Sequence, residues 1–147
     1  MLPRYHILLG TIFTLLILII LPGINLIYLS LIFLSSFLID FDHYAMSVIK
    51  TGKISLLKSF DYHNKARIVQ EKEIRARIKR KGDFHLFHTI EFHLFVGLLG
   101  LIWIGFFYVF IGMVFHSLLD IYDGLKKGWL YRREFFFFNW ISKKLII

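Results

Sequence analysis

Two long apolar stretches free of lysine and arginine dominate the chain, and a basic segment separates them. No Lys or Arg occurs between residues 5 and 49 or between residues 82 and 125, whereas residues 50–82 hold 11 of the 18 basic residues. Apolar stretches of this length without cations are typical of membrane-crossing segments and not of a soluble core. The pattern therefore predicts an integral membrane protein of the all-α class.

The first apolar block has a turn signal in its middle, the Pro-Gly pair at residues 22–23. One helix candidate lies on each side of this pair, Ile7–Leu21 before it and Ile24–Ile39 after it. Each is slightly shorter than the roughly 20 residues that cross a bilayer. Two arrangements fit this pattern: a hairpin of two short spans, or one long tilted helix kinked at Pro22. We favour a hairpin over residues 5–39, because it returns the end of the block to the side on which it began.

The second apolar block poses the same choice. In one straight helix, His93 and His116 would lie about 34 Å apart, on opposite sides of the bilayer. A helix and a return helix, turning near the glycines of residues 100–105, would bring both histidines to one surface. We therefore expect a second hairpin over residues 84–122, and a bundle of about four short helices in two hairpins.

The basic segment, residues 50–82, contains a weak amphipathic helical pattern. Between Lys65 and Lys81, isoleucines recur among Lys, Arg and Glu. We interpret the segment as an arm lying on anionic lipid headgroups, with a solvated loop helix as the open alternative. Nucleic acid is not an expected partner, because no recognition motif accompanies the charge.

The end of the chain, residues 125–147, mixes aromatic and basic residues. Such a tail is typical of an anchor at the membrane interface, and packing over the mouth of the bundle is the alternative. No repeat or linker divides the chain, so we expect one membrane-embedded domain, residues 1–147. With both hairpins formed, the cations share one side, which the positive-inside rule makes cytoplasmic.

Ionisable residues cluster at the ends of the apolar blocks, where they are costly and therefore indicate a site. A spacing of four places His116 and Asp120 on one helix face, and Asp123 follows three residues later. His88 and His93 would lie roughly 140° apart on a regular helix, so we expect a helix start, kink or loop between them. The candidate metal ligands are His6, Asp40, Asp42, His43, His88, His93, His116 and Asp120.

Histidine and carboxylate ligands suit zinc, with manganese or iron as alternatives. A thiolate site is excluded, because the chain has no cysteine. The candidates outnumber the four ligands of one zinc ion, which favours more than one ion. Neighbouring ions would bind a phosphoryl group and lower the pKa of bound water. Glu91 is the preferred general base and Asp42 a second catalytic candidate, while a role for Glu91 in orienting an imidazole remains open.

The order of these motifs resembles that of the bacterial and archaeal membrane-bound metal-dependent hydrolases, a family distantly similar to zinc-dependent phospholipase C. The matched motifs are an early His (His6), D-x-D-H (Asp40, Asp42, His43), H-x-x-x-x-H (His88, His93) and H-x-x-x-D (His116, Asp120). The family's middle motif usually reads H-R-G-x-T-H-S, and this chain has Thr89 in place of its arginine. The resemblance covers about residues 5–124 and implies metal-dependent hydrolysis, with a phosphoester such as a phospholipid as the expected substrate.

Two other functions use the same residues. A metal-binding or transport protein would hold an ion without hydrolysis, with ligands lining a path through the bilayer. A structural membrane subunit would use the histidines and aspartates for hydrogen bonds between helices. His63, which precedes the basic arm, is interpreted as a surface or capping residue outside the site.

Overall fold

The computed structural model describes residues 3–145, so residues 1–2 and 146–147 of the expected single domain lie outside it. The described residues form helices and contain no β-strand, which confirms the all-α class. The α-helices are α1 (Pro3–Ile20), α2 (Leu26–Leu38), α3 (Phe41–Thr51), α4 (Leu56–Arg75), α5 (Ile90–Leu99), α6 (Ile104–Lys127) and α7 (Phe137–Leu145). Two 3₁₀ turns, η1 (Leu86–His88) and η2 (Leu130–Arg132), lie between them.

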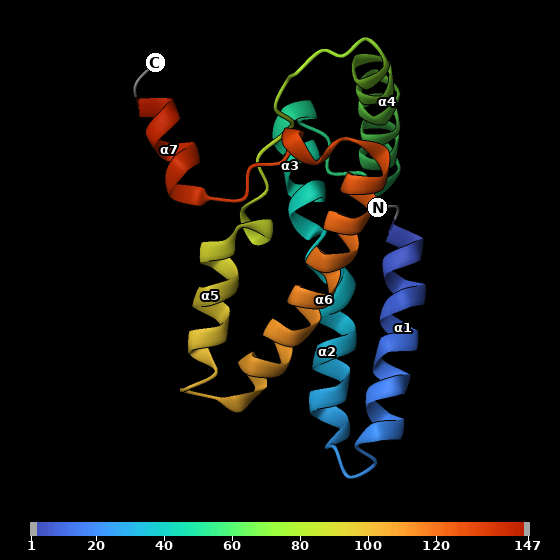
Figure 1. Ribbon diagram of the computed structural model, residues 1–147, viewed down its shortest axis with the longest axis vertical. Helices are drawn as coiled ribbons and strands as arrows, with labels where there is room; N and C mark the ends of the chain where they lie inside the picture. Colours follow the sequence, from blue (N-terminus) through green and yellow to red (C-terminus); the bar gives the residue numbers. More distant parts are fainter. Residues whose placement is uncertain (1–2, 146–147) are drawn as a thin grey trace.

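The long helices lie side by side, with their connections at alternating ends (Figure 1). α1 and α2 run in opposite directions, and α6 packs against α1, α2 and α5. The start of α1, the junction between α2 and α3, the start of α5 and the last turns of α6 all lie at one end of the bundle (Figure 1). Helices α3 and α4 pack together at that same end.

Three helical segments of the described chain are long and apolar enough to cross a membrane: Pro3–Ile20, Leu26–Thr51 and Ile104–Lys127. The fourth expected span is shorter than predicted, because α5 has only 10 residues. At 1.5 Å per residue it reaches about 15 Å, half of a hydrocarbon core of about 30 Å. Residues 84–89, which the prediction placed in this arm, form a loop and the turn η1 instead.

The bundle exposes large apolar side chains and buries few of them. Ile19, Leu101 and Ile102 are each more than 70% exposed. The buried apolar residues Ile39, Val96 and Met113 form a small core at the contacts of α2, α5 and α6. Exposed apolar helices fit a lipid solvent, in which no water drives their burial.

Helices α2 and α6 approach closely where Gly112 faces Ser35 and the backbone of Ile32. A Cβ atom at residue 112 would overlap both groups, so the contact requires glycine. Small residues at such contacts are typical of membrane helix pairs, because van der Waals packing drives their association. The close approach brings the later part of α6 against the end of α2.

The basic arm differs from its prediction. Its helix, α4, begins earlier than Lys65 and ends at Arg75, before Lys81. The backbone of Arg77 has a φ of 57°, which a regular right-handed helix does not permit. The chain then runs without helix to η1, so that Arg77 and the basic residues 79–81 lie on a loop.

Candidate metal centre

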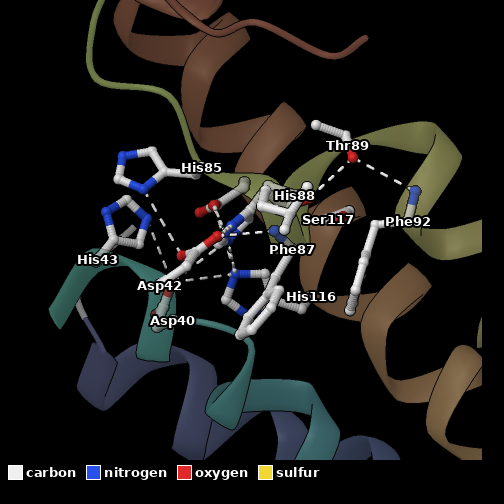
Figure 2. Close-up of polar contacts among 12 residues, drawn as sticks. Asp40, Asp42, His43, His85, Phe87, His88, Thr89, Phe92, His116 and Ser117 are labelled. Carbon is white, nitrogen blue, oxygen red and sulfur yellow. Dashed lines mark hydrogen bonds and ion pairs between the residues drawn. The ribbon is translucent and has the colours of Figure 1, made fainter. Parts of the chain in front are cut away.

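Four separate parts of the chain contribute histidine and aspartate side chains to one end of the bundle. His6 comes from α1, and Asp40 lies in the break between α2 and α3. His88 ends the turn η1, while His116 and Asp120 lie one turn apart on α6. Figure 2 shows Asp40, His88 and His116 pointing toward one another.

We call Asp40, His88, His116 and Asp120 the inner group. Nε2 of His88 lies 3.2 Å from Nε2 of His116. Oδ1 of Asp40 lies 3.5 Å from the first nitrogen and 3.4 Å from the second. Oδ2 of Asp120 lies 4.0 Å from Nε2 of His88 and 3.5 Å from Nε2 of His116.

These separations match the edges of a zinc coordination tetrahedron. Bonds of about 2.0–2.1 Å in tetrahedral geometry place neighbouring ligand atoms about 3.3–3.4 Å apart. The five distances that join the two imidazoles to each other and to each carboxylate range from 3.2 to 4.0 Å. The two imidazole nitrogens and each neighbouring carboxylate oxygen therefore lie at spacings that suit a divalent cation, and a different ion with similar bond lengths would fit equally.

Two hydrogen bonds orient the histidines of the inner group. Nδ1 of His116 donates to the carbonyl oxygen of Ser36 at 2.9 Å. Nδ1 of His88 donates to Oδ2 of Asp42 at 3.0 Å. A proton on Nδ1 leaves Nε2 as the lone-pair nitrogen, so both rings present a metal-binding atom to the inner group.

His6 lies against the inner group and is fully buried. Its ring stacks on that of His116 with centroids 3.8 Å apart, and its Nε2 lies 3.2 Å from Oδ1 of Asp120. Neither ring nitrogen makes a hydrogen bond of good geometry to any described residue. Buried polar atoms without a well-aligned hydrogen bond are rare, and a metal ion or a water molecule would provide a partner for these nitrogens.

A second set, Asp42, His43 and His85, forms what we call the outer group. Their ligand atoms lie within 4.8 Å of one another. His43 is the more exposed member, with 35% of its side chain accessible, against 14% for His85. Oδ1 of Asp42 and Nδ1 of His85 are buried without hydrogen-bond partners among the described residues. Asp40 connects the groups, because its Oδ1 also lies 3.5 Å from Nε2 of His43.

His85 is a site residue that the sequence analysis did not include. It precedes η1, and its ring lies 3.7 Å from that of His43 between centroids. Burial lowers the pKa of His85 to about 4, against the attraction of Asp42. The imidazole is therefore neutral near pH 7, which is the form that binds metals. Its spacing of three residues from His88 was the available signal.

Two predicted site residues belong to neither group. Nδ1 of His93 donates to the carbonyl oxygen of Thr89 at 2.8 Å, and the Ser117 hydroxyl lies 3.0 Å from Nε2. Glu91 accepts hydrogen bonds from the backbone N–H groups of Phe137 and Phe138, at 3.0 and 3.4 Å. The carboxylate thus stabilises the start of α7, and the structure gives no support to Glu91 as a base.

Two further residues support the site from outside. Nε2 of His63, on α4, lies 3.0 Å from the carbonyl oxygen of His43 and so ties α4 to the outer group. Asp123 accepts a hydrogen bond from the indole of Trp129 at 3.3 Å and pairs with Lys127 at 2.7 Å. Asp123 therefore lies on the predicted helix face, but its contacts are with residues at the end of α6.

Arg133 was also absent from the predicted site. Its Nη1 lies 3.0 Å from Oδ2 of Asp120, and only 9% of its side chain is exposed. Arg133 belongs to the tail that the sequence suggested as an interfacial anchor, and the tail here folds back against the start of α5. The sequence offered no spacing by which to connect residue 133 with Asp120.

Comparisons with protein-family models, with curated proteins and with solved structures found no match for this chain.

Proposed function

We propose that this chain is a membrane-embedded, metal-dependent hydrolase whose substrate is a phosphoester such as a phospholipid. The observation that carries the proposal is the inner group: two imidazole nitrogens 3.2 Å apart, with one oxygen of Asp40 and one of Asp120 each within 4.0 Å of both, from three separate segments. Hydrogen bonds between helices do not need such convergence, since two partners suffice. The motif resemblance to membrane-bound metal-dependent hydrolases agrees with this assignment.

In this proposal the inner group holds one divalent cation, with zinc as the best fit to its nitrogen and oxygen donors. The outer group holds a second ion, and Asp40 lies between the two. Such ions supply Lewis-acid chemistry, lowering the pKa of bound water and neutralising charge on a phosphoryl oxygen. Asp42 orients His88 and contributes its other oxygen to the outer group. Glu91 takes no part in the proposed chemistry.

The membrane arrangement in this proposal keeps two antiparallel helix pairs. α1 crosses and α2 returns, and α6 crosses beside the shorter α5. Both groups then lie at the end of the bundle that carries the basic helix α4, which the positive-inside rule places on the cytoplasmic side. The basic residues of α4 and of the following loop would attract anionic lipid headgroups to the site.

Transport is the competing assignment. A transport path would distribute ligands along the depth of the helices, whereas the two groups are connected through Asp40 and lie close to each other. This grouping supports hydrolysis or fixed metal binding over passage through the bilayer.

Asp120→Ala tests the assignment in detergent-purified protein. We would measure bound metal by mass spectrometry, and hydrolysis of phosphatidate vesicles after zinc loading. If the variant loses both bound metal and hydrolysis, the result supports the enzyme. If the wild type binds metal but hydrolyses nothing, and the variant loses the metal, the result supports a binding protein. Wild-type protein that stays free of metal under zinc-replete conditions would overturn the proposal. Leu118→Ala, an exposed position on the same helix, is the matched control.

A further inference from the structure

The segment that follows α6 holds Arg133 beside the inner group by backbone contacts on both sides. The N–H of Gly82 donates to the carbonyl oxygen of Arg132 at 2.8 Å, and the N–H of Ile90 donates to that of Phe135 at 2.9 Å. Nζ of Lys81 donates to the carbonyl oxygen of Arg133 itself at 3.0 Å. The position of this arginine is thus fixed by the loop that leads into the metal centre.

The guanidinium of Arg133 is buried, and the carboxylate with which it pairs, that of Asp120, also contacts other side chains. Asp120 also lies against His6 and His116, and it would share its charge with an ion in the inner group. A cation in the inner group would then stand next to a buried arginine cation. The carboxylates of Asp40 and Asp120 together balance the charge of one divalent cation, so the buried guanidinium charge would be left over and would favour a further anion. A guanidinium also offers several N–H donors in a plane, which match the oxygens of a phosphate in pairs.

This arginine is among the residues that line an apolar cavity of about 260 Å³. His88 and Ser117 also line it, and Leu94, Phe110 and Val114 are among its apolar walls. Leu94 is 57% exposed on the apolar helix α5, so this wall of the cavity also faces the lipid side of the bundle. Sites for whole drug-sized ligands measure about 300–1,000 Å³, so this cavity suits one part of a larger molecule.

We propose that Arg133 and this cavity form the binding site for an amphiphilic phosphoester drawn from the bilayer. Arg133 contacts the phosphate oxygens, and the cavity between α5 and α6 holds the apolar chain next to the ester. The inference rests on the metal centre proposed above and adds to it the residue that recognises the anion and the cavity that holds the apolar chain. A soluble phosphoester would leave the cavity unfilled.

The test measures binding without turnover, using alkyl phosphonates that cannot be hydrolysed as esters. Dissociation constants of methylphosphonate and octylphosphonate are measured by calorimetry on zinc-loaded protein in one detergent. Arg133→Met should weaken both ligands on the order of tenfold or more, because a charge-assisted contact is lost. Val114→Phe fills the cavity and should weaken only the binding of octylphosphonate. The dissociation constant should rise by about fourfold for each methylene group that the larger side chain excludes from the cavity.

Matched controls separate these effects from general damage. Lys126→Met removes an exposed cation near the end of α6, and Leu118→Phe enlarges an exposed side chain one turn from Val114. Both should bind as the wild type does. Arg133→Lys should recover part of the affinity for both phosphonates, and it replaces Arg133→Met if that variant does not fold.

Two results would overturn the inference: unchanged affinity in Arg133→Met, or equal losses for both phosphonates in Val114→Phe. Its failure is distinguishable from failure of the proposed hydrolase. If the wild type binds octylphosphonate through Arg133 but hydrolyses no phosphoester, the proposed hydrolase is rejected and the proposed binding site is retained. If the wild type hydrolyses phosphatidate but Arg133→Met does not change phosphonate binding, the proposed hydrolase is retained and the proposed binding site is rejected.

Discussion

Asp40 connects the inner and outer groups, yet the fold holds the side chains of the two groups differently. His88 and His116 are fully enclosed, and each has its ring fixed by a hydrogen bond from Nδ1. In the outer group, His43 is 35% exposed and Nδ1 of His85 has no hydrogen-bond partner among the described residues. Preorganised ligands lose less freedom when they bind an ion. We therefore expect a tightly held inner ion and an exchangeable outer one.

The largest expected effect is that of His116→Gln. It removes one of four inner ligands, so zinc affinity should fall by more than the about 10–100-fold typical of changes to a ligand's supporting partner. Chelator competition on the purified variant measures this loss. An inner-site affinity equal to that of the wild type would show that His116 is not a ligand.

Asp42→Asn should come next, because Asp42 serves both groups. The amide keeps the size of the side chain but cannot supply the carboxylate that fixes His88 at 3.0 Å. Affinity for the inner ion should drop by about 10–100-fold, and the outer ion should be lost. Metal stoichiometry and chelator competition together separate the two effects. Loss of the outer ion alone would mean that His88 needs no such support.

His85→Gln should affect only the outer group. We expect the zinc content to fall from two ions per chain to one, while the affinity of the remaining ion stays within about threefold, since its ligands are untouched. His93→Gln, which changes a histidine that belongs to neither group, is the control. Removal of both ions by His85→Gln would contradict the division into two groups.

The smallest effect is expected for Asp83→Asn. Asp83 pairs with Lys50 and accepts a hydrogen bond from Tyr62 at 2.9 Å, which positions the chain two residues before His85. The pair is partly exposed, so its loss is worth at most about 1 kcal/mol, or about fivefold in outer-ion affinity. Dialysis against graded zinc concentrations measures that change. A larger loss would mean that the segment before η1 depends on Asp83.

The same residue gives a pH dependence. Burial raises the pKa of Asp83, but hydrogen bonds from Lys50 and Tyr62 outweigh it and hold the pKa below its usual value. A lowered folded pKa stabilises the protein above the unfolded value of about 3.9, and this contribution disappears as pH falls through the folded pKa. Thermal unfolding of wild type and Asp83→Asn should therefore differ at pH 6 and converge in strong acid. A constant difference across that range would contradict this role for the carboxylate.

Local spacing indicated part of the candidate site. His116 and Asp120 lie together because a spacing of four holds on any regular helix, and both contribute to the inner group. Asp40 and Asp42 converge with the histidines because the helix is interrupted at residues 39–40, a break that the cluster of polar residues suggested. For these residues the information lies within a few positions of the chain.

Other parts depend on packing that a single sequence does not reveal. Whether His93 joins the ligands depends on where α5 starts, and a start at Ile90 directs its ring toward Thr89 and Ser117. Glu91 finds its partners only because the tail returns to the start of α5. Arg133 meets Asp120 for the same reason. The all-helical class follows from the long apolar blocks without lysine or arginine, but the short length of α5 depends on the loop before it.

The close contact of Gly112 with α2 has a consequence for biosynthesis. His116 and Asp120 reach Asp40 only after α6 has packed against α2, although His6 and Asp40 emerge from the ribosome much earlier. A nascent chain halted before α6 would therefore lack two of the four side chains of the inner group, although Asp42, His43 and His85 of the outer group would already be present. If the inner group holds an ion as proposed, its capture would have to follow the packing of α6.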